Sequence, residues 1–109
     1  MGYRMHVFKQ REIALENEYF YRETMSYRNK IQRTRIFGLM LADSMGFNDD
    51  AADRYADSLV DMYADTRSDS DLIDRVLCDL HDIGIAEQPE FITRKLGEAE
   101  NLAEAEYSF

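Results

Sequence analysis

Apolar residues recur every three or four positions through most of the chain after residue 47, which is the period of an amphipathic helix. Asn48 and the two acids that follow it predict the start of a helix that runs to about Thr66. Its expected inward residues are Ala52, Tyr55, Ala56, Leu59, Val60 and Tyr63. Its opposite face carries acids at every fourth position: Asp53, Asp57, Asp61 and Asp65. The pattern predicts one buried and one hydrated face.

Two more helices follow with the same kind of pattern. Ser70, or Ser68 before it, caps a third helix that ends at Gly84. Its expected inward residues are Leu72, Ile73, Val76, Leu77, Leu80 and Ile83. A fourth helix is expected from about Gln88 to Glu106, with Pro89 in the first turn, where proline is tolerated. Its expected inward residues are Ile92, Leu96, Ala99 and Ala103, with Phe91 and Leu102 beside them.

The stretch from Phe8 to Gly46 lacks proline and falls into two halves. In the second half, apolar residues share a face: Ile31, Gly38, Leu41, Ala42 and Met45, flanked by Phe37 and Met40. Gly38 would let another helix approach closely. In the first half, apolar residues are scattered around the helix, and Tyr19, Phe20 and Tyr21 are consecutive. A single helix of roughly 37 residues would be about 55 Å long, which exceeds the width of a compact domain of this size.

These elements predict an all-α fold, a four-helix bundle with a long first helix whose N-terminal part is mobile or protruding. We expect residues 1–22 to form a partner-binding arm and residues 23–109 to form the bundle. No segment alternates with the period of a strand. No apolar run is long enough to span a bilayer, and the N-terminus lacks the apolar region of a signal peptide, so we expect a cytoplasmic protein without direct membrane insertion.

The charge of the chain is unevenly distributed. Residues 1–42 hold eight basic and four acidic residues, a net charge of +4, whereas residues 43–109 hold five basic and eighteen acidic residues, a net charge of −13. This asymmetry suggests a cationic arm on an acidic body. The acidic body would repel a polyanion, so nucleic acid is not expected as a partner.

The residue types that carry catalysis or hold metals do not form a recognisable motif. An EF-hand loop beginning at Asp69 would place Asp74 where glycine is required and Leu80 where a bidentate glutamate is required. His81 lies on the polar side of its helix, and Cys78 has no cysteine partner. We expect no enzymatic activity, no metal and no cofactor.

A basic cluster with an interleaved tyrosine gives one alternative function, a nucleotide- or phosphate-ligand-binding module. The possible ligand-binding residues are Arg22, Tyr27, Arg28, Arg33 and Arg35. The opposing interpretation is that these basic side chains lie over the bundle and pair with its acidic helices. A third hypothesis is an oligomerising scaffold, but the scattered apolar residues of the first half favour a monomer in isolation.

One set of residues resembles a known family, the zeta subunits that inhibit the F-type ATP synthases of alphaproteobacteria. The resemblance rests on Phe8-x-x-Arg11-Glu12-x-Ala14-x-Glu16-x-x-Tyr19 and on Arg33-x-Arg35-x-x-Gly38-x-x-x-Ala42-x-x-Met45-Gly46. Tyr55-Ala56 and the helix end Asp79-Leu80…Gly84 extend it along almost the whole chain. The resemblance implies a four-helix bundle whose N-terminal segment inserts between catalytic subunits at the rotor and blocks ATP hydrolysis.

The resemblance also implies the partners and their binding residues. The partners would be the catalytic and rotor subunits of the ATP synthase, which would hold the protein at the periphery of the inner membrane. The expected partner-binding residues are Phe8, Arg11, Glu12, Ala14, Glu16 and Tyr19. Because Tyr19-Phe20-Tyr21 is bulkier than the small and polar residues usual in this family, a member that keeps the fold but inhibits weakly or not at all is a further alternative.

Overall fold

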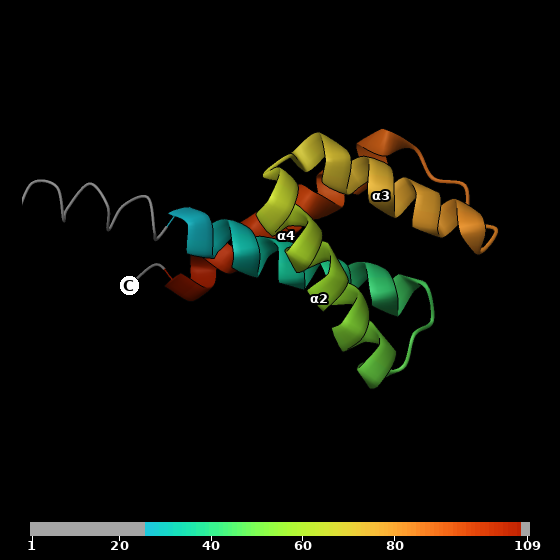
Figure 1. The fold of residues 1–109 in the computed structure, drawn as a ribbon, viewed down its shortest axis with the longest axis horizontal. Coiled ribbons are helices and arrows are strands. Elements are labelled where there is room, and N and C mark those ends of the chain that lie inside the picture. Colours follow the sequence, from blue (N-terminus) through green and yellow to red (C-terminus); the bar gives the residue numbers. More distant parts are fainter. Residues whose placement is uncertain (1–25, 108–109) are drawn as a thin grey trace, which may run out of the picture.

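The computed structural model describes residues 26–107, which form four helices (Figure 1). The first helix covers residues 26–44, followed by α2 (Asp49–Thr66), α3 (Asp69–Asp82) and α4 (Pro89–Tyr107). The four helices pack compactly, and the described residues contain no strand, as the sequence pattern predicts. The expectation of a mobile or protruding N-terminal part concerns residues outside the described range.

Side-chain caps set the starts of α2 and α3. The side-chain oxygen of Asn48 accepts a hydrogen bond from the backbone N–H of Ala51 at 2.8 Å. The hydroxyl of Ser68 accepts one from the backbone N–H of Asp71 at 3.1 Å, so Ser68, and not Ser70, caps α3. Each cap satisfies a backbone donor that has no partner inside its helix.

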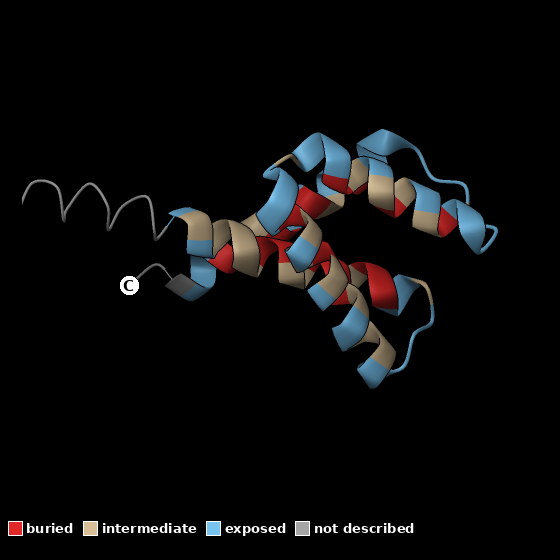
Figure 2. Ribbon diagram, viewed as in Figure 1, coloured by how far each residue is buried: buried red, intermediate tan, exposed pale blue. Residues whose placement is uncertain are grey.

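The hydrophobic core draws residues from all four helices, and the buried positions lie on the inward faces of the ribbon (Figure 2). The largest apolar side chains buried in the core are Phe37, Leu41, Leu59, Tyr63, Leu72, Val76, Leu80, Ile92 and Leu96. All four inward positions predicted for the last helix are buried.

Ile83 is an exception to the predicted core, because it is 47% exposed. The helix α3 ends at Asp82, and the chain then turns through Gly84, which has a φ of +83°. Ile83 therefore lies beyond the last helical turn, and Ile85, on the far side of the turn, packs against the core instead. Phe91 and Leu102, expected beside the inward face of α4, are also exposed.

The first helix and α2 cross at Gly38, where the two backbones approach closely. A β-carbon at Gly38 would lie 2.7 Å from the Cα atom of Ala56. No side chain fits at this distance without moving one of the helices. The predicted close approach at Gly38 is therefore confirmed, and glycine is required here for lack of space and not for a special backbone angle.

None of the described helices is both long enough and apolar enough to cross a membrane.

Candidate functional site

The basic residues of the first helix lie in one short run. Residues 26–42 contain Arg28, Lys30, Arg33 and Arg35 and no acidic residue. The other four basic residues of residues 1–42 lie in residues 1–25. All four acidic residues of residues 1–42 lie there too, so residues 1–25 have a net charge of zero. Residues 1–22, the proposed arm, hold four basic and three acidic residues, so most of the excess positive charge of residues 1–42 lies on the first helix of the bundle.

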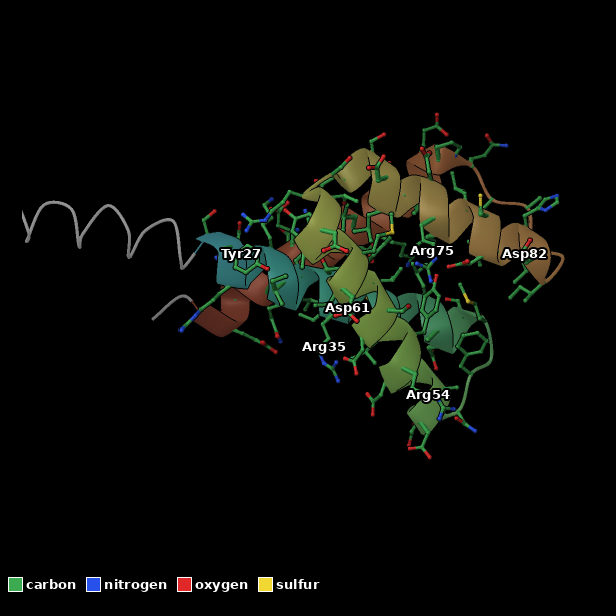
Figure 3. All side chains as sticks on the ribbon, in the orientation of Figure 1. Tyr27, Arg35, Arg54, Asp61, Arg75 and Asp82 are labelled. Carbon is green, nitrogen blue, oxygen red and sulfur yellow. The ribbon has the colours of Figure 1, made fainter. Side chains whose placement is uncertain are left out.

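Three of these basic residues each pair with a different helix. Lys30 binds Glu100 of α4 at 2.7 Å. Arg33 binds Asp69 of α3. Arg35, which is labelled in Figure 3, binds both Asp57 and Asp53 of α2. The opposing interpretation of the basic cluster, in which it pairs with the acidic helices, is thus confirmed for these three residues.

Arg33 makes the most buried of these contacts. Its two terminal nitrogens donate to the two carboxylate oxygens of Asp69 at 3.1 and 2.8 Å. Its guanidinium also lies over the ring of Tyr63, with 5.0 Å between the guanidinium carbon and the ring centroid. The Arg33 side chain is only 1% exposed. This paired and stacked geometry suits the planar guanidinium and would not suit a lysine.

A second arginine holds the start of the first helix. The guanidinium of Arg67 lies over the ring of Tyr27, with its carbon 4.2 Å from the ring centroid. Arg67 caps the C-terminus of α2, directly after Thr66, and its backbone is in the left-handed region, with φ 52° and ψ 29°. Its backbone N–H donates to the carbonyl of Tyr63 at 2.8 Å, which closes the last turn of α2. Figure 3 shows Tyr27 at the beginning of the first helix.

An open pocket of about 350 Å³ lies beside this contact. Its lining residues combine two aromatic rings, two cations and a hydroxyl: Ser26, Tyr27, Lys30, Tyr63 and Arg67. Aromatic faces and cations together suit a flat ligand that carries negative charge. Of the possible ligand-binding residues predicted from the sequence, Tyr27 lines this pocket, whereas Arg33 and Arg35 point into ion pairs.

The remaining predicted site residues are placed as follows. Arg28 is exposed on the first helix. Arg22 and the six predicted partner-binding residues (Phe8, Arg11, Glu12, Ala14, Glu16 and Tyr19) lie outside the described residues. The sequence reasoning missed Lys30 and Arg67 as pocket residues. Arg67 directly follows the predicted end of its helix, in a position where glycine is usual, and this was the available signal.

A polar network joins α2 to α3 on another side of the bundle. The hydroxyl of Tyr55 donates to Asp79 at 2.8 Å, and Asp79 also binds the side chain of Arg75 at 3.0 Å. Arg75 reaches the hydroxyl of Ser58 on α2 (Figure 3). Burial, and then the hydrogen bond to Asp79, raise the pKa of Tyr55 well above its ordinary value. These hydrogen bonds join α2 to α3, and each polar side chain of the network has a partner within it.

The described residues offer no group of histidine, cysteine and carboxylate side chains that would hold a metal ion. His81 is exposed, as predicted, and Cys78 is exposed as well.

Comparison with protein-family models matches residues 5–106 to the family described as ATPase inhibitor subunit zeta. The chain belongs to this family. Zeta-family membership gives it the role of an ATPase inhibitor, a regulator and not an enzyme, and implies binding to the ATP synthase. The family resemblance predicted from the sequence is thus confirmed. No curated protein and no solved structure matched the chain.

Proposed function

We propose that this zeta-family protein inhibits ATP hydrolysis by inserting residues 1–22 at a catalytic interface of the F-type ATP synthase, beside the rotor. Residues 23–109 would act as the scaffold that presents this segment. The observation that supports the proposal most is the family match, which begins at residue 5 and therefore includes the whole set of predicted partner-binding residues.

The internal ion pairs of the bundle support the same division of roles. Lys30, Arg33 and Arg35 are already paired with acids of α4, α3 and α2. Releasing them for a partner would leave unpaired charge in the bundle, most of all at the buried Arg33. These ion pairs support the proposal that residues preceding them in the chain recognise the ATP synthase.

The proposed roles of the partner-binding residues follow from their side chains. Phe8 and Tyr19 would be the apolar anchors in the cleft between subunits, and Ala14 would allow close approach. Arg11, Glu12 and Glu16 would form charge pairs that fix the register of the segment. Such pairs generally contribute more to specificity than to affinity. We expect the two apolar anchors to dominate binding together with Arg11, because arginine is among the residue types that dominate interfaces.

Site-specific photo-crosslinking with purified ATP synthase tests the interface. A photoreactive phenylalanine analogue at Phe8 or Tyr19 should crosslink to catalytic and rotor subunits, whereas the same group at the exposed Arg94 of α4 should not. Equal crosslinking from all three positions would contradict insertion of the N-terminal segment.

The pocket beside Tyr27 favours a second candidate function, the binding of a nucleotide or another flat phosphate ligand. Arg67 would face the phosphates, and Tyr27 or Tyr63 would contact the base. Titration with ATP, followed through the amide resonances of the lining residues, tests this candidate. Resonances that do not move at millimolar ATP would exclude it.

A further inference from the structure

The corner between α2 and α3 holds the first helix at two points. Arg67 contacts the ring of Tyr27, and Asp69, two residues further on, binds Arg33. We propose that the Tyr27–Arg67 contact is a clasp that fixes the direction in which the first helix leaves the bundle toward residues 1–22.

The spacing of the two points supports this role. Tyr27 and Arg33 are six residues apart, which is about 9 Å along a helix. One contact fixes the position of a helix, and a second contact at this distance also fixes its direction. Lys30, between the two, is bound to Glu100 of α4, so the helix is held from α4 as well as from the α2–α3 corner.

The backbone of Arg67 supports a dedicated role for its side chain. In the left-handed region a residue with a β-carbon is strained, and glycine is the usual residue where a helix ends in this way. Strained positions persist where the side chain makes a contact that offsets the strain. The Arg67 side chain makes such a contact with the ring of Tyr27.

The clasp has a consequence for inhibition, which rests on the proposed function. A segment that leaves the bundle in a fixed direction loses less freedom when it binds than one attached through a loose helix start. Loosening the clasp should therefore weaken inhibition, although neither clasp residue belongs to the predicted partner-binding set.

Amide hydrogen exchange of the full chain tests the clasp without the ATP synthase. Arg67→Gly removes the side chain and relieves the backbone strain, and Tyr27→Leu removes the ring. Either substitution should speed the exchange of amides 27–31 roughly two- to fivefold, as expected for the loss of one exposed cation–π contact. The double variant should exchange no faster than either single variant, because both changes remove the same contact. Tyr27→Phe, which keeps the ring, is the matched control and should exchange like the wild type.

The thermal midpoint separates the clasp from general destabilisation. Arg67→Gly should not lower the midpoint, since glycine is unstrained at this position. Unchanged exchange at amides 27–31, or effects of the two substitutions that add in the double variant, would overturn the clasp.

Titration of ATP hydrolysis then tests the link to inhibition. Arg67→Gly should raise the half-maximal inhibitory concentration about two- to fivefold, in parallel with the faster exchange. Faster exchange with unchanged inhibition would overturn the role of the clasp in directing residues 1–22. If the wild-type protein does not inhibit at all, the proposed function fails, and the exchange data still decide whether the clasp exists.

Discussion

Arg33 holds both carboxylate oxygens of Asp69, and the two ends of this ion pair lie in very different surroundings. The Arg33 side chain is 1% exposed, whereas that of Asp69 is 50% exposed. Asp69 is also in the first turn of α3, where the helix dipole favours a negative charge. Water and the helix terminus can therefore stabilise Asp69 without its partner, whereas the buried Arg33 would keep the ring of Tyr63 but little access to water.

This asymmetry predicts that the exposed partner is the more sensitive position. Asp69→Asn leaves a buried guanidinium without its counter-charge and should lower the free energy of unfolding by about 2–3 kcal/mol. Arg33→Met removes the buried charge, keeps apolar volume and should cost only about 1 kcal/mol. Urea unfolding measures both. Asp57→Asn is the matched control at the exposed pair with Arg35 and should cost about 0.5 kcal/mol or less. A greater loss for Arg33→Met than for Asp69→Asn would contradict this account.

Two glycines inside helices should respond to alanine in opposite directions. Gly38→Ala places a methyl group 2.7 Å from the Cα atom of Ala56 and should destabilise the protein by about 1–3 kcal/mol. Gly97→Ala, on α4, meets nothing within 4 Å and should stabilise it by about 0.5–1 kcal/mol through helix propensity. Thermal unfolding of both variants checks the pair. Equal shifts at the two positions would mean that the first helix and α2 do not cross at Gly38.

Tyr55 should make the stability of the protein sensitive to alkaline pH. Its pKa in the folded protein is raised above the ordinary value of 10.0, so the folded state holds this proton more tightly than the unfolded state. The resulting stability is complete below pH 10 and falls as the pH rises above it, because the unfolded state then loses the proton first.

Tyr55→Phe isolates this effect from the other groups that titrate at high pH. At pH 7 the variant should be less stable by about 1 kcal/mol, since the hydrogen bond to Asp79 is lost. Above about pH 10 the advantage of the wild type should shrink by roughly 1.4 kcal/mol per pH unit. Denaturant unfolding at pH 7, 9 and 11 measures the difference. A difference that stays constant over this range would show that Tyr55 titrates normally.

Arg11 should be the most sensitive single charge for inhibition. Arg11→Ala should raise the half-maximal inhibitory concentration at least about tenfold, since arginine is among the residue types that dominate interfaces. The exposed Arg94 of α4 is the matched control, and Arg94→Ala should leave inhibition unchanged. Equal effects of the two substitutions would indicate a general charge effect and not a specific contact of the N-terminal segment.

The sequence predicted most of the fold because its helix signals are local. Asn48 caps α2 as expected, and the inward face of α4 is buried as the period requires. Ile83 was misplaced because periodicity alone does not show where the last turn of a helix gives way to the following loop. Of the two serines proposed as caps, only Ser68 accepts a hydrogen bond from the helix start through its side-chain oxygen, a choice that depends on the backbone of the preceding corner.

The candidate site was less predictable because it depends on contacts between residues far apart in the chain. Arg33 was named as a possible ligand-binding residue beside the alternative of pairing with the acidic helices, and the sequence did not show that its partner would be Asp69, 36 positions away. The contact between Tyr27 and Arg67 likewise requires knowing how the α2–α3 corner sits against the first helix. A local sequence pattern does not show which distant residues come into contact. The family motif, by contrast, was sufficient to predict the role of an ATPase inhibitor.

Steady-state ATP hydrolysis by the purified ATP synthase, titrated in parallel with the full chain and with residues 23–109, tests the central claim most directly. The shorter chain retains every described core residue, and circular dichroism should confirm that it is folded. The account predicts inhibition by the full chain and none by residues 23–109. Inhibition by the folded shorter chain at the same concentrations would contradict it.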